Sequence, residues 1–178
     1  MKTQKKNYLE KKSVIRIPFQ VLILLTIIFN SNVSAQANVE LSDINVLNNT
    51  NWQGSLMYVD YSSGEETVLQ TTMQLTIKGA KIIMSTQYNN EPKANSKGSI
   101  KLKKGGSYFG NEKVVEKSKL KDNMIKIVTT YEGFDNNKKA TIYKTYLFNS
   151  RVYSVTKEIQ LNGSKEKFTR NKYSYTRI

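Results

Sequence analysis

Apolar and polar residues alternate along most of the chain after residue 50, and short polar turns interrupt the alternation. Residues 51–61 place Trp52, Gly54, Leu56 and Tyr58 at every second position. A period of two predicts β-strands with one buried face. Applied to the whole chain, it predicts strands near residues 51–61, 67–77, 81–88, 98–103, 108–109, 112–118, 123–131, 139–149, 151–160 and 166–176.

The order of these strands predicts an all-β fold. One short helix is expected within residues 39–49, with Ser42 as its N-terminal cap. Asn162-Gly163 is a strong hairpin sequence, because both residues tolerate positive φ. Nine or ten strands joined by near-sequential hairpins favour an antiparallel up-and-down β-barrel. A sandwich of two sheets is the alternative.

Residues 1–35 have the order of a secretory signal peptide. A basic stretch is followed by an apolar run over residues 17–29 and then by small residues ending at Ala35 and Ala37. The apolar run is shorter than the roughly 20 residues that span a bilayer. Cleavage after Ala35 or Ala37 is expected, leaving a lead-in over residues 36–50 and a barrel domain over residues 51–178. The expected location is secreted or periplasmic, and the mature chain is not expected to cross a membrane.

Composition narrows the chemistry further. The chain of 178 residues contains no Cys and no His, which excludes disulfides, lipoprotein anchoring, thiol or imidazole catalysis and His-ligated metals. Cleavage after Ala35 would remove six basic residues and one acidic residue, lowering the net charge from +14 to +9.

Carboxylate pairs give little support for an enzyme. Glu65–Glu66 and Glu132/Asp135 are the nearest pairs in sequence, and both lie at turns, where solvated carboxylates are usual. Residues 135–137 lack the acidic spacing of a calcium loop. The sequence therefore predicts a protein without enzymatic activity, catalytic residues, metal or cofactor.

The segment Leu47–Leu56, with Trp52 beside Gly54, resembles the start of a lipocalin-like (calycin) barrel. The chain is also similar in pattern to small secreted lipocalin-like proteins of Bacteroidetes-type bacteria. In that family the indole closes one end of the barrel, and a cation of the last strand stacks on it. The resemblance implies that Arg170, ahead of Lys172 and Arg177, stacks on Trp52. The family's haem-binding members use His, which this chain lacks.

A barrel of this size is either filled by side chains or holds one small ligand. Large inward residues would supply hydroxyl and thioether groups to a cavity, although Tyr also suits the outer face. The sequence alone leaves open which face of each strand points inward. The expected ligand-binding residues are Tyr58, Met73, Met84, Tyr88, Tyr131, Tyr146 and Tyr153.

Lysines gather in the middle of the chain. Outer-face and edge-strand positions explain most of them, while a patch that attracts an anionic envelope surface is the functional alternative. Nucleic acid is not expected as a partner of an exported protein. Two functions therefore stay open: binding of a small apolar or amphipathic molecule inside the barrel, and interaction through a basic surface over a filled core. These lysines are Lys101, Lys103, Lys113, Lys117, Lys119, Lys121 and Lys126.

Overall fold

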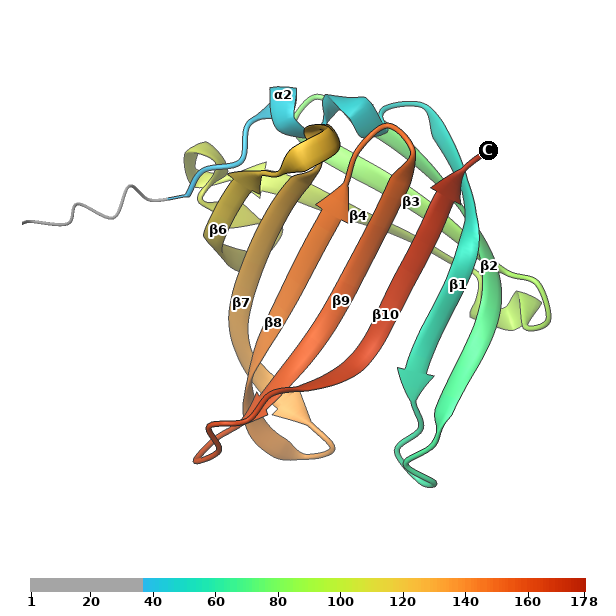
Figure 1. Ribbon diagram of the computed structural model, residues 1–178, viewed down its shortest axis with the longest axis vertical. Helices are drawn as coiled ribbons and strands as arrows, with labels where there is room; N and C mark the ends of the chain where they lie inside the picture. The colour runs from blue at the N-terminus through green and yellow to red at the C-terminus, as the bar shows by residue number, and fades with distance from the viewer. Residues whose placement is uncertain (1–36) are drawn as a thin grey trace, which may run out of the picture. The chain divides into compact units, whose positions relative to one another are not determined.

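The computed structural model describes residues 37–178, so the predicted signal peptide and a cut after Ala35 lie outside the described residues. Ten antiparallel strands form one closed up-and-down barrel, in which β1 pairs with β10 (Figure 1). The prediction of an all-β barrel is therefore confirmed, and the sandwich alternative is wrong. No helix among the described residues is long and apolar enough to cross a membrane.

The strands follow the predicted ranges closely, because most are delimited by turns that are visible in the sequence. Gly64, Gly79 and Gly163 all have positive φ in the turns that follow β1, β2 and β9. β5 is much shorter than the other strands. The strands are β1 (Thr50–Val59), β2 (Glu66–Lys78), β3 (Lys81–Tyr88), β4 (Ser96–Lys103), β5 (Tyr108–Phe109), β6 (Glu112–Lys119), β7 (Ile125–Asp135), β8 (Lys138–Phe148), β9 (Val152–Leu161) and β10 (Phe168–Arg177).

A short helical segment lies across one end of the barrel (Figure 1). It consists of α2 (Leu41–Ile44) followed by the 3₁₀ turn η1 (Asn45–Leu47). Within this segment, the side chains of Ile44 and Leu47 are fully buried. The predicted cap is wrong: Glu40 is the N-cap residue, and its backbone N–H donates to the Asp43 carboxylate at 2.7 Å. Ser42 instead lies within the helix and donates to the Glu40 side chain.

Three further 3₁₀ turns join the strands, namely η2 (Pro92–Ala94), η3 (Lys104–Gly106) and η4 (Lys121–Asn123). Gly106 in η3 accepts a hydrogen bond from the backbone N–H of Val39 at 3.0 Å, which ties the lead-in segment to the barrel. A Cβ at Gly106 would lie 2.1 Å from the Val39 carbonyl oxygen, so this contact requires glycine.

Trp52 and Met73 are opposite each other across β1 and β2 and point into the barrel, where they pack with buried residues of the other strands such as Ile127 and Phe148. Trp52 is fully buried, and its indole N–H donates to the Thr50 hydroxyl at 2.7 Å. That hydroxyl donates in turn to the Leu47 carbonyl at 2.7 Å. These two hydrogen bonds thus connect the buried indole to η1, and the barrel end beneath the helical segment is filled.

β1 and β10 form the seam that closes the barrel. Their register runs from Trp52 opposite Arg177 to Tyr58 opposite Asn171. A Cβ at Gly54 would lie 1.9 Å from the Ser174 carbonyl oxygen, so the two backbones approach at a distance that only glycine permits. Beyond Asn171 the two strands diverge towards the other end of the barrel (Figure 1).

Candidate functional site

The barrel interior contains a cavity of about 380 Å³ between the β2–β4 wall and the β7–β10 wall. Ser96 and Gly98 line the cavity and are also exposed, so the cavity opens to solvent along β4. The β3–β4 wall is mainly apolar or small, with Met84, Ile100 and Gly98. Such a volume is in the range of small-molecule sites.

The opposite wall is built in two rows that follow from strand register. The first row, Tyr173–Val155–Tyr146, crosses β10, β9 and β8. The second row crosses the same strands one pleat further along, as Asn171–Lys157–Lys144. All six residues line the cavity, so an aromatic and apolar band lies beside a cationic one.

Lys144 is neutralised within the barrel. Its ammonium group forms an ion pair with the Glu112 carboxylate of β6. Glu112 also accepts hydrogen bonds from the Thr129 hydroxyl at 2.6 Å and the Tyr146 hydroxyl at 3.2 Å. Burial and the nearby Glu112 charge raise the pKa of Tyr146 well above its usual range, so its hydroxyl stays protonated and donates to the carboxylate.

Lys157 has no such partner. Among residues 37–178, four salt bridges form, and none of them includes Lys157. Its Cα partners across the sheet are Lys144 and Asn171. Burial lowers the pKa of Lys157, and the neighbouring Lys144 and Arg170 charges add to this, while Asp135 and Glu112 oppose it. The cavity therefore presents an ammonium group without a direct counter-ion.

Several tyrosine hydroxyls also face the cavity. Tyr173 and Tyr88 share a hydrogen bond of 2.9 Å between their hydroxyls, and Tyr175 accepts one from Thr71 at 3.1 Å. Tyr153 and Tyr131 also line the cavity. Burial raises the pKa of both residues, so each hydroxyl stays protonated.

The structure gathers five of the seven sequence-predicted ligand residues around this cavity, namely Met73, Met84, Tyr131, Tyr146 and Tyr153. Tyr58 and Tyr88 do not line it. Both share the interior face by register, Tyr58 opposite Asn171 and Tyr88 opposite Thr71. That any of them binds a ligand stays a prediction.

The expected stacking of Arg170 on Trp52 is wrong. Trp52 pairs with Arg177 at one end of the seam, whereas Arg170 lies beyond Asn171 near the other end. Its guanidinium group is 4.3 Å from the Tyr61 ring centre and 5.1 Å from that of Phe168. The resemblance identified a residue that stacks, but the seven-residue offset along β10 places it far from the indole.

Arg170 instead forms a latch with Asp135 and Tyr61, in which the ion pair is buried and Tyr61 is exposed. Its Nε donates to Asp135 at 3.0 Å, a second nitrogen forms an ion pair with the same carboxylate, and Tyr61 donates to it at 2.8 Å. A weaker bond of 3.4 Å reaches the Val59 carbonyl. The latch therefore joins β10, β1 and β7 where the seam diverges. Asp135 was expected to be solvated, but its side chain is only 2% exposed.

Sequence reasoning missed the cationic row and the last-strand tyrosines. Strand parity could have found Lys144, since it alternates with Ile142 and Tyr146, both buried. The same parity places Lys157 between Val155 and Ile159. Neither lysine was considered as a site residue from the sequence, because lysine is mostly exposed in folded proteins.

A second hollow, of about 400 Å³, lies beside β1–β3 and the C-terminal Ile178. Its strand positions are mostly outward-facing and uncharged, such as Thr72, Gln74 and Ser85. It lacks the convergent apolar wall and charged groups of the interior cavity, which is therefore the candidate site.

The sequence matches no protein-family model and no curated protein. Its structure is similar to that of the S-type phycobiliprotein lyase CPES from Guillardia theta, with a TM-score of 0.47 and 11% sequence identity. The similarity covers 79% of this chain and 93% of that chain. Lipocalin-like family membership thus stays a prediction from the sequence.

Proposed function

We propose that this protein is an exported, non-enzymatic, lipocalin-like barrel that binds a small apolar or amphipathic molecule in its interior. The observation that carries the proposal is the cavity of about 380 Å³, which opens to solvent along β4 and is lined by Met, Ile, Val and Tyr side chains. A convergent apolar site with a few placed polar groups is the usual form of a small-molecule site.

Gly98 offers a direct test, because it lines the cavity without needing to be glycine. A Cβ there would meet only the Met84 methyl group, at 3.8 Å. Gly98→Leu should fill the mouth of the cavity and leave the strand intact. Ser99→Leu, on the next and outward-facing position of β4, is the matched control.

The assay follows fluorescence of the neutral apolar dye Nile red. We expect saturable binding to the wild type and to Ser99→Leu, and weaker binding by about tenfold or more in Gly98→Leu. Equal binding by all three proteins would place the dye outside the barrel and overturn the proposal. Native mass spectrometry of protein from the cells that make it would then identify any bound molecule.

A basic outer surface supports a second function, interaction with an anionic envelope surface. Lys81 and Lys101 are exposed and directly opposed across β3 and β4, and no described carboxylate pairs with either. Like charges in that position are unfavourable and would be relieved by an anionic partner. Co-sedimentation with phosphatidylglycerol vesicles, but not phosphatidylcholine vesicles, would support this function.

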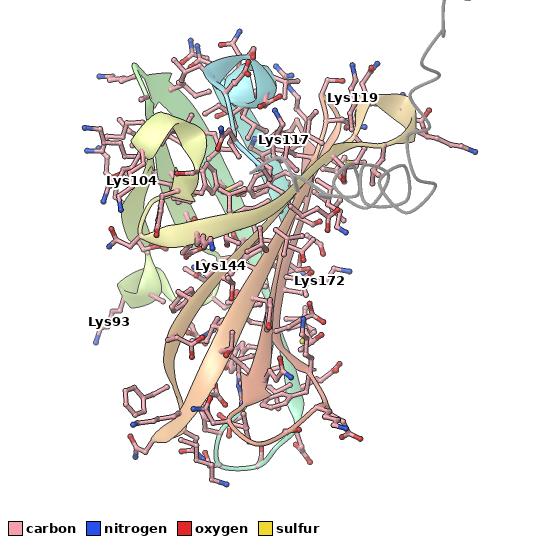
Figure 2. All side chains as sticks on the ribbon, turned by 90° about the vertical axis from the view of Figure 1, so that its left-hand side faces the viewer. Lys93, Lys104, Lys117, Lys119, Lys144 and Lys172 are labelled. Atoms are coloured by element: carbon pink, nitrogen blue, oxygen red, sulfur yellow. The ribbon has the colours of Figure 1, made fainter. Side chains whose placement is uncertain are left out.

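Two findings weaken that alternative. Lys117 and Lys126 are taken up by ion pairs with Asp43 and Glu116, at 3.0 and 2.9 Å. The exposed lysines also project from different sides of the barrel rather than from one patch, as Lys93, Lys104 and Lys172 show (Figure 2). Interior binding is therefore the stronger proposal.

A further inference from the structure

The charges inside the barrel do not balance. The strands from β6 to β10 bring the charged side chains of Glu112, Asp135, Lys144, Lys157 and Arg170 together in the barrel. Glu112 pairs with Lys144, and Asp135 pairs with Arg170. One positive charge, at Lys157, is left without a contact partner.

Neither carboxylate is free to take Lys157 as well. Asp135 already accepts from Arg170 and Tyr61, and Glu112 already accepts from Lys144, Thr129 and Tyr146. Lys157 also lies directly opposite Lys144 across the β8–β9 pair. Like charges so placed repel each other, and partial burial makes the repulsion less screened. A molecule in the cavity that brought one negative charge to Lys157 would relieve both costs.

The apolar surface of the cavity indicates that the rest of that molecule is apolar. Met84 and Ile100 lie on β3 and β4, on the wall opposite Lys157 in the closed strand order. Val155 lies on the same face as Lys157, one pleat away. Asn171 lies opposite Lys157 in register, and both Asn171 and Tyr131 line the cavity, where the amide and the hydroxyl can donate to an anionic oxygen.

We propose that the ligand is an amphipathic anion with a monoanionic head such as a carboxylate, held at Lys157 Nζ, and an apolar tail between Met84, Ile100 and Val155. This inference rests on the proposed interior binding and deepens it. Its charge is set by the single uncompensated ammonium group, and its shape by the position of that group beside an apolar wall.

The test compares four probes with the same alkyl chain: decanoate, decyl phosphate, decanol and decyltrimethylammonium. Each displaces Nile red from the folded full-chain protein. We expect decanoate to bind about tenfold more tightly than decanol, since its carboxylate can pair with the Lys157 ammonium group in a hydrogen bond between opposite charges and the neutral hydroxyl of decanol cannot. The cationic probe should bind most weakly, because it meets Lys157 and Lys144.

Three variants locate the effect. Lys157→Met should reduce the preference for decanoate over decanol to within about twofold, and Lys157→Arg should retain it. Lys172→Met removes the same charge from the outer face, where Lys172 is exposed (Figure 2), and should change nothing. Circular dichroism confirms that each variant is folded, and the Arg variant keeps the test decisive if Lys157→Met is unstable.

The outcomes separate this inference from the function on which it rests. Equal affinity for decanoate and decanol would overturn the anionic ligand and leave interior binding intact. A preference that persists in Lys157→Met would overturn the assignment to Lys157, and tighter binding of decyl phosphate would overturn the monoanionic head. Failure of all four probes and of Nile red to bind the wild type would overturn both proposals.

Discussion

Arg170→Met removes the cation of the latch while keeping most of the side-chain volume. In the wild type, the Asp135 side chain is 2% exposed and that of Arg170 is 12% exposed, so the pair is shielded from water. After the substitution, Asp135 keeps only the Tyr61 hydroxyl as a side-chain donor. Removing one partner of a buried pair typically costs about 3–5 kcal/mol, and loss of the cation–π contact adds about 0.5–1 kcal/mol.

The assay is urea denaturation followed by tryptophan fluorescence, because Trp52 is the sole tryptophan of the chain and lies at the far end of the seam. Arg151→Met is the matched control: Arg151 is exposed, and its substitution should change stability by less than about 0.5 kcal/mol. The double variant Asp135→Asn/Arg170→Met leaves no unpaired charge at the latch and should be more stable than Arg170→Met alone.

Two results would refute this reasoning. A loss below about 1 kcal/mol for Arg170→Met would mean that the pair behaves as an ordinary surface ion pair. A double variant whose loss equals the sum of the two single losses would mean that Asp135 and Arg170 do not interact.

Three further predictions concern the same barrel. Burial favours a higher Asp135 pKa, but hydrogen bonds from Arg170 and Tyr61 outweigh it and lower the pKa below its usual 3.8. The ionised carboxylate therefore stabilises the fold fully above pH 3.8, and this stabilisation is lost as the pH falls through the lowered pKa. The difference in unfolding free energy between wild type and Asp135→Asn, measured by urea denaturation, should shrink as the pH is lowered. A difference that stays constant with pH would contradict this. Thr50→Val leaves the indole N–H without its acceptor and should cost about 1–3 kcal/mol in urea denaturation, whereas no loss would show that the bond contributes nothing. Gly54→Ala forces β1 away from β10 and should abolish the cooperative thermal transition or lower its midpoint sharply; an unchanged midpoint would refute the close approach.

The strand pattern was predictable because a strand that is buried on one face has apolar residues at every second position. Trp52, Leu56, Met73 and Leu75 are buried on the interior side, and the residues between them are more exposed. The turns were also predictable from local sequence, as at Gly163, which has a φ of 86°. Local chemistry therefore sufficed for element order and topology.

The stagger between distant strands was not predictable. Whether Arg170 lies beside Trp52 or seven residues further along the seam depends on the register of β1 against β10, which no local pattern records. The irregularity between Thr169 and Asn171 changes the alternation of β10 just at Arg170. That irregularity directs the arginine towards Asp135.

The cavity was predictable in part, for the same reason. Met73, Met84 and three tyrosines were predicted because large side chains on inward positions would line a cavity, and these residues do line it. Lys157 was not considered, because a lysine is expected on an outward position unless the residues around it show that its position faces inward. In the structure, Val155 and Ile159, two residues to either side, show this inward orientation.

The seam between β1 and β10 also constrains how the chain can fold during synthesis. Gly54 must meet Tyr175, a partner about 120 residues further along, so β1 leaves the ribosome long before its partner exists. At about 5–20 residues per second, the first strand waits on the order of ten seconds. Throughout that time the edge of β1 that later pairs with β10 is unpaired, and an unpaired edge can pair with another chain.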